Sequence, residues 1–123
     1  MNKQLSYAVD RAGNIPYKRG QSRHYCVIVN KRGKVVAEAA NSYVTTHPVM
    51  AKVSKRVGLD KTFCHAEALA LLRAAKKVGK GDKGLSLYVA RVDAKGNATN
   101  SEPCPVCKLM IEESGVIKNV YHT

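Results

Sequence analysis

Long apolar runs and acidic side chains are scarce in this sequence. No segment approaches the roughly 18 consecutive apolar residues that a membrane-spanning helix requires, so we expect no membrane partner. Residues 1–7 contain no apolar stretch that would serve as a secretion signal. These two absences predict a soluble protein with a cytoplasmic location.

The shortage of acidic residues leaves a strong positive charge. The chain has 21 Lys and Arg against 9 Asp and Glu, which gives a net charge of +12. Residues 1–63 hold 12 basic and 3 acidic side chains, net +9, whereas residues 64–123 hold 9 and 6, net +3. A field of this sign favours a polyanionic partner, most commonly nucleic acid. The alternative is a basic surface that serves solubility. No basic amphipathic helix with large aromatic residues is visible, so a membrane surface is less favoured.

The length and the hydrophobic pattern predict one α/β domain over residues 1–123. A short helix is expected first, followed by elements in the order β-β-α-β-α-β. Strands that alternate with helices imply crossover connections and a mixed sheet, here of about four strands. The predicted strands are 25–30, 35–40, 85–91 and 116–121, and the predicted helices are 4–12, 64–78 and 104–114. The irregular connector 41–63 contains one further candidate helical piece, 49–57.

The four cysteines are more consistent with metal or redox chemistry than with disulfides. Paired cysteines in a reducing compartment usually bind metal or exchange electrons. Cys26 lies in an apolar strand and is expected in the core. Cys64 is expected to be a small buried side chain, with a fourth metal ligand as the alternative. Cys104 and Cys107 taken alone would also fit a thioredoxin-like redox pair.

Two short motifs at the starts of the two main helices carry the chemistry. One is His65-Ala66-Glu67, and the other is Pro103-Cys104-Pro105-Val106-Cys107. Cysteines at i and i+3 share a helix face, and the helix dipole favours thiolates at a helix N-terminus. Two thiolates and one imidazole suit Zn²⁺ and leave a fourth position open, which is typical of a catalytic site. Glu67 is then placed to take a proton from water at that position.

The two motifs together resemble the zinc-dependent cytidine and deoxycytidylate deaminase superfamily, whose signature is His-x-Glu followed by Pro-Cys-x-x-Cys. The resemblance covers residues 23–121 and is greatest to small deaminases of phages and bacteria, which implies the cytoplasm of a bacterial or phage-infected host cell. It also implies a three-layer α/β/α fold and one catalytic Zn²⁺. Many relatives continue with a further helix and strand, so we expect a fold truncated at the C-terminus.

The resemblance also implies roles for individual residues. It makes His65, Cys104 and Cys107 the zinc ligands and Glu67 the catalytic base and acid. The substrate contacts that it implies are Asn41 to the sugar, the Ala66 N–H to the base carbonyl, the Glu102 carbonyl to the leaving amino group, and Phe63, Tyr43 or Tyr88 as stacking aromatics.

The segment 42–63 is long and basic for a connector within a small domain. Its cations predict weak contacts with phosphate or nucleic acid, although a turn residue is the alternative for its histidine. His24 and His122 are expected at the surface or a sheet edge. The expected phosphate contacts are His47, Lys52, Lys55, Arg56 and Lys61.

Three functions remain open on these grounds. The charge favours deamination of cytosine in single-stranded DNA or RNA, because a base inside a duplex is out of reach. The alternative is deamination of free deoxycytidylate or cytidine, and adenine or guanine substrates are less favoured. The third is a zinc-stabilised nucleic-acid-binding protein without catalysis. The sequence gives no indication of the oligomeric state.

Overall fold

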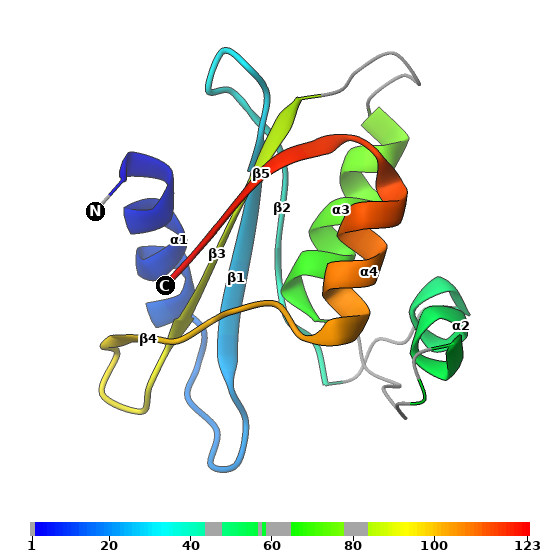
Figure 1. Ribbon diagram of the computed structural model, residues 1–123. Coiled ribbons are helices and arrows are strands. Elements are labelled where there is room, and N and C mark those ends of the chain that lie inside the picture. Colours follow the sequence, from blue (N-terminus) through cyan, green and yellow to red (C-terminus); the bar gives the residue numbers. More distant parts are fainter. Residues whose placement is uncertain (1, 44–47, 57, 59–64, 78–83) are drawn as a thin grey trace.

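The computed structural model describes residues 2–43, 48–56, 58, 65–77 and 84–123 (Figure 1). Within these residues, every helix is too short or too polar to traverse a lipid bilayer. The helices are α1 (Lys3–Gly13), α2 (Pro48–Arg56), α3 (Ala66–Lys77) and α4 (Pro105–Ser114). The strands are β1 (Arg23–Val29), β2 (Val35–Ala40), β3 (Leu85–Val92), β4 (Ala98–Thr99) and β5 (Ile117–His122).

The strands form one mixed sheet in the order β2-β1-β3-β4, with β5 also paired to β3. The pairs β1–β2, β1–β3 and β3–β4 are antiparallel, whereas β3–β5 is parallel. The parallel pair follows from the α4 crossover, because two parallel neighbours cannot be joined by a tight turn. As a result, β2 and β3 end, and β1 begins, at the same end of the sheet.

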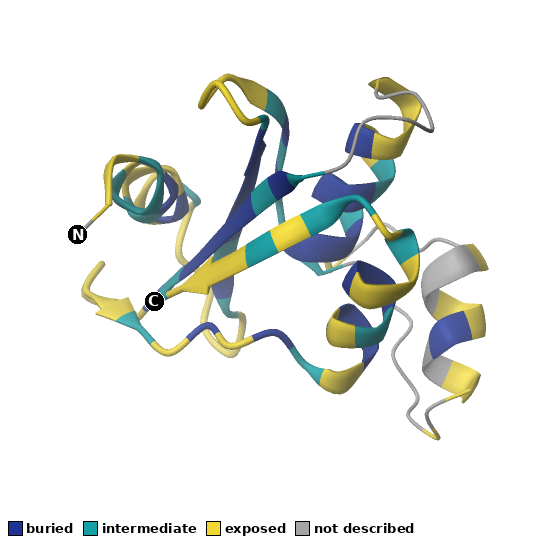
Figure 2. Ribbon diagram, turned by 45° about the horizontal axis from the view of Figure 1, so that its top comes forward, coloured by how far each residue is buried: buried dark blue, intermediate teal, exposed yellow. Residues whose placement is uncertain are grey.

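Helices cover both faces of the sheet, which makes the molecule three-layered (Figure 1). One core cluster joins the sheet to α3 and α4 and includes Cys26, Leu87 and Val89. The other joins the sheet to α1 and includes Val27 and Tyr88. Side chains alternate between the two faces along a strand. Because helices cover both faces of the sheet, most side chains of β1 and β3 are buried and apolar whichever face they point to (Figure 2).

Local sequence explains where two of the helices begin and end. The Asn2 side chain accepts the N–H groups of Gln4 and Leu5 and so caps α1. Pro105 occupies the first position of α4, where its missing N–H costs nothing. Gly115 ends α4 at φ 68°, a left-handed conformation that glycine adopts without a side-chain clash.

The α/β fold and the three layers are confirmed, with differences in detail. The sheet has five strands among the described residues, because the two-residue β4 lies in a segment predicted as loop. Two residues of alternating pattern are too few to be read as a strand. Strand β1 begins at Arg23 rather than at 25, and α3 is described from Ala66 rather than from 64. The predicted range of β2 matches the structure.

Candidate metal centre and active site

Both sequence motifs lie at the end of the sheet where β1 begins and β2 and β3 end. Helices α3 and α4 both start there, so their N-termini point toward one place (Figure 1). In α/β sheets, ligands commonly bind beyond the carboxyl ends of strands. The first N–H groups of a helix lack partners within the helix and favour negative charge. This end of the molecule is therefore suited to thiolates and to a polar ligand.

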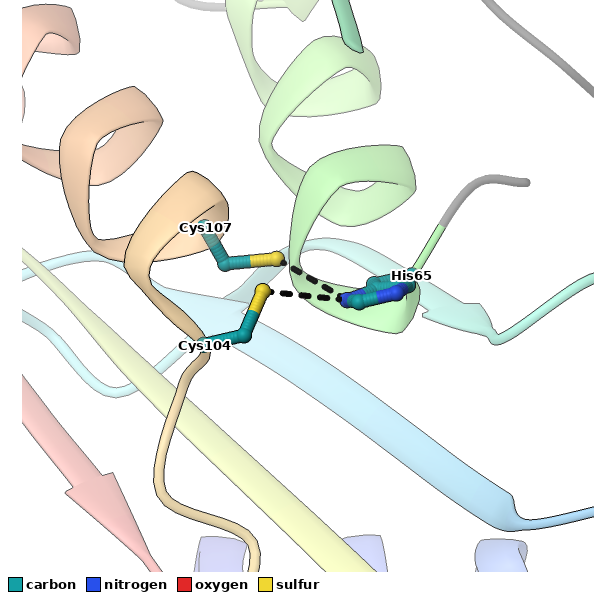
Figure 3. Close-up of side chains that lie close together, drawn as sticks. All are labelled: His65, Cys104 and Cys107. Atoms are coloured by element: carbon teal, nitrogen blue, oxygen red, sulfur yellow. Dashed lines mark hydrogen bonds between the residues drawn. The ribbon is translucent and has the colours of Figure 1, made fainter. Parts of the chain in front are cut away.

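His65, Cys104 and Cys107 turn their side chains toward one another (Figure 3). The His65 Nδ1 atom lies 3.4 Å from the Sγ atom of each cysteine. The three ligand atoms all lie within 4.8 Å of one another. A tetrahedral zinc ion with Zn–S of about 2.3 Å and Zn–N of about 2.0 Å would separate nitrogen from sulfur by roughly 3.5 Å. The donor set and its spacing therefore fit one zinc ion.

The side chains of Cys104 and Cys107 shift each other's pKa in opposite directions. The Cys107 thiol, as a hydrogen-bond partner, lowers the pKa of Cys104 to about 3, and His65 lowers it further, although burial opposes both. The same contact and burial raise the pKa of Cys107. The lowered pKa favours the thiolate form of Cys104, which is the form that binds metal.

Glu67 lies in the first turn of α3 and is buried, with 4% of its surface exposed. Its Oε1 atom has no hydrogen-bond partner within the part of the chain that the structure describes. Burial raises the pKa of this carboxyl group, and Cys107 is among its hydrogen-bond partners. A buried carboxyl oxygen without a partner is unfavourable in a purely structural role. Beside a zinc-binding group it is suited to hold a proton or a water molecule.

The structure brings three of the expected substrate contacts to this end of the molecule. Ala66 is the first residue of α3, so its N–H is one of those without a partner in the helix. The Asn41 amide joins the ends of two strands: Oδ1 accepts the His24 N–H at 3.0 Å, and Nδ2 donates to the Ser22 carbonyl at 3.0 Å. The Tyr43 hydroxyl accepts the Ser22 N–H at 2.8 Å. Their roles toward a substrate stay predictions.

Tyr88 is not at the site. It belongs to the core on the α1 face and stacks on Tyr121 with a ring separation of 4.9 Å. Its neighbours Leu87 and Val89 face α3 and α4 instead. Strand alternation therefore places the Tyr88 ring on the far side of the sheet from the zinc ligands, which corrects the expectation that it stacks on a base.

The remaining expected contacts divide into three groups. The Glu102 side chain pairs with Lys108 at 2.9 Å, which leaves the predicted role of its backbone carbonyl untested. In α2, Lys52 and Lys55 are exposed, but Arg56 forms two hydrogen bonds to Glu113 of α4, at 2.6 and 2.9 Å. Its guanidinium is thus used to join two helices. Phe63, His47, Lys61 and the alternative ligand Cys64 lie outside the described residues.

Sequence reasoning missed two residues near the site. His24 and Arg91 are opposite each other on β1 and β3, and His24 is partly buried rather than at a sheet edge. Burial, with Arg91 and His65 next, lowers the pKa of His24 to about 4. The predicted strand 25–30 stopped short of His24; with β1 beginning at Arg23, alternation from Cys26 places His24 on the same face. The pairing with Arg91 required the register of the sheet.

A three-layer α/β fold with a His/Cys/Cys group at two helix N-termini fits the class of zinc-dependent deaminases. The family model of the cytidine and deoxycytidylate deaminase zinc-binding region matches residues 2–123. The chain therefore belongs to this family, and its members are zinc-dependent hydrolases of C–N bonds. No curated protein matches the sequence.

Two solved structures share the fold. One is the dCMP deaminase from the cyanophage S-TIM5, in complex with dCMP and dUMP, with 22% identity and a TM-score of 0.56. That match covers 99% of this chain and 82% of the other. The second is a mutant of the cytidine deaminase from Mycobacterium tuberculosis, with 18% identity and a TM-score of 0.52, covering 95% of this chain and 80% of the other.

Proposed function

We propose that this protein catalyses the hydrolytic deamination of cytosine to uracil in a cytosine nucleotide, with free deoxycytidylate as the first candidate substrate. The observation that supports this most is the buried Glu67 carboxyl group, unpaired at Oε1, beside His65, Cys104 and Cys107. A structural zinc site would be closed by a fourth protein ligand and would need no buried acid next to it.

The zinc ion, when bound by the three ligands, supplies a Lewis acid that activates a water molecule. Glu67 would take one proton of the attacking water and deliver it to the ring nitrogen N3 as the water oxygen forms a bond to C4, and would then move the second proton, from the hydroxyl group added at C4, to the leaving amino group. The C4–N4 bond breaks and a C4 carbonyl remains. One cytosine and one water thus give one uracil and one ammonia. The Ala66 N–H and the Glu102 carbonyl hold the base carbonyl and the amino group during these transfers.

Two observations favour different substrates. The family and both structural neighbours are named for deamination of cytidine or deoxycytidylate, which supports a free nucleotide. The net charge of +12, with +9 in residues 1–63, favours cytosine in single-stranded DNA or RNA as the second candidate.

The single domain over residues 1–123 and a cytoplasmic location stay predictions.

The test supplies the zinc-loaded protein with dCMP, deoxycytidine, cytidine and a cytosine-containing single-stranded oligonucleotide in parallel. Uracil and ammonia are both measured, at two salt concentrations. Turnover of dCMP with little salt dependence supports the free-nucleotide function. Turnover of the oligonucleotide alone, falling steeply with salt, supports the polynucleotide function instead. Full zinc loading without uracil from any substrate would leave a zinc-stabilised binding protein and refute catalysis.

A further inference from the structure

His24 of β1 and Arg91 of β3 are cross-strand partners. Residues directly opposite each other in an antiparallel pair point to the same face. The next inward-facing pair along these strands, Cys26 and Val89, belongs to the core that contains Cys107. His24 and Arg91 therefore lie on the face that carries the zinc ligands, at the end of the sheet where α3 and α4 begin.

The electrostatic surroundings of His24 agree with this placement. Burial is the largest cause that lowers its pKa, and the charges of Arg91 and His65 lower it further, while Cys104 raises it. The His24 imidazole is therefore close enough to Arg91 and to two of the zinc ligands, His65 and Cys104, to feel their charges. An imidazole ring has at least one N–H to donate in either protonation state.

Arg91 differs from the other arginine at this end of the sheet. Arg23 is buried, and its guanidinium donates to the carbonyls of Gly13, Ile15 and Asp93. Arg91 is only partly buried, and its guanidinium has no hydrogen bond or ion pair to any residue that the structure describes. Arg91 thus presents a cation with free donors beside the site, where Arg23 presents none.

We propose that Arg91, together with His24, binds the 5′-phosphate of the cytosine nucleotide and so makes the enzyme specific for nucleotides over nucleosides. A guanidinium matches two phosphate oxygens with two parallel hydrogen bonds, and His24 donates a third. This inference rests on the proposed deaminase function. The same contact serves a monoester, as in dCMP, or the diester 5′ to a cytosine in a single strand.

The experiment compares Arg91→Gln with the wild-type protein on dCMP, deoxycytidine and the single-stranded oligonucleotide. The matched control is Arg32→Gln, since Arg32 is exposed in the turn between β1 and β2 at the opposite end of the sheet. Charged hydrogen bonds of this kind correspond to a loss of about 10- to 100-fold. We expect kcat/KM for dCMP to fall by that factor in Arg91→Gln and to stay unchanged for deoxycytidine. The fall in kcat/KM for dCMP should be smaller in Arg91→Lys than in Arg91→Gln. His24→Gln should also lower kcat/KM for dCMP, by a smaller factor than Arg91→Gln.

Further results distinguish a phosphate monoester from a diester as the ligand, and a failure of the phosphate site from a failure of the deaminase function. A loss confined to the oligonucleotide supports the same phosphate contact with a diester as its ligand. An equal loss on dCMP, deoxycytidine and oligonucleotide, or no loss on any, overturns the inference. Calorimetry compares the affinity of the protein for dUMP with its affinity for deoxyuridine, and this comparison does not depend on turnover. If no cytosine is deaminated but dUMP still binds more tightly than deoxyuridine through Arg91, the function fails and the phosphate site stands.

Discussion

The His65 Nδ1 atom lies 3.4 Å from the Cys104 Sγ atom, although 39 positions separate the two residues in the chain. The contact exists because α3 and α4 both begin at the end of the sheet where β2 and β3 end. Two separate helix N-termini thus supply one nitrogen and two sulfurs to one point.

Zinc content should depend on the two cysteines of α4. We expect about one zinc per chain in the wild-type protein and close to none in Cys104→Ser or Cys107→Ser, because each change removes a thiolate ligand. Elemental analysis of the purified proteins measures this. Cys26→Ala is the control, since Cys26 is a fully buried cysteine of the same core but does not belong to the group of three ligand residues. Equal zinc in all four proteins would contradict the assignment.

Glu67→Gln should keep zinc and lose turnover. The amide has nearly the same shape but cannot accept and return a proton, so we expect a loss of about 10²- to 10⁴-fold in kcat. The measurement combines zinc content with steady-state rates on the best substrate. Glu112→Gln, an exposed change on α4, serves as control. A Glu67→Gln protein with near-wild-type kcat would refute the role of this carboxylate.

Arg23→Met should destabilise the fold without changing the zinc site. The Arg23 Nη1 donates to Ile15 O at 3.0 Å and to Gly13 O at 3.4 Å, and Nη2 donates to Asp93 O. These bonds tie the loop after α1 to the turn after β3. We expect the free energy of unfolding to fall by about 2–4 kcal/mol, measured by urea denaturation. Arg19→Met, an exposed change, should have little effect, and equal stability of the two variants would be the contrary result.

The Tyr7 hydroxyl should titrate late. It donates to Glu38 at 2.6 Å, and this bond, with burial and the Glu38 charge, raises the pKa of Tyr7 to about 12. Because the folded pKa lies above the unfolded value of 10, the associated stability is present below pH 10 and is lost as the pH rises toward 12. Absorbance titration of tyrosinate measures the shift. Glu38→Gln should move a titration step back toward pH 10, whereas an unchanged curve would contradict the contact.

The sequence predicted the parts of the molecule that depend on local pattern. The local pattern predicts α3 and α4 from their helical periodicity, the end of α4 from its glycine, and the strands from their apolar residues. These elements place the two motifs at helix starts. The spacing of Cys104 and Cys107 on one helix face was readable for the same reason. His65 joined them through the resemblance of the paired motifs to a known family.

The sequence could not predict which face a doubly buried strand turns toward the site. In β3, Leu87 and Val89 on one face and Tyr88 and Ala90 on the other are all apolar, so alternation of polarity gives no signal. The error on Tyr88 follows from that. The neighbourhood of His24 and Arg91 depends on the register of β1 against β3, which is a tertiary property. Arg56 was expected at a phosphate, and its partner Glu113 lies 57 positions away.

The most direct test of the central claim is a zinc titration of the metal-free protein with uracil formation as the readout. Wild-type protein and Glu67→Gln are titrated side by side with dCMP and with the cytosine-containing oligonucleotide. We predict no product without zinc, a linear rise in wild-type rate to a plateau at about one zinc per chain, and a flat line for Glu67→Gln. Product formation that is independent of zinc, or one zinc bound with no uracil from either substrate, would contradict the claim that this protein is a zinc-dependent cytosine deaminase.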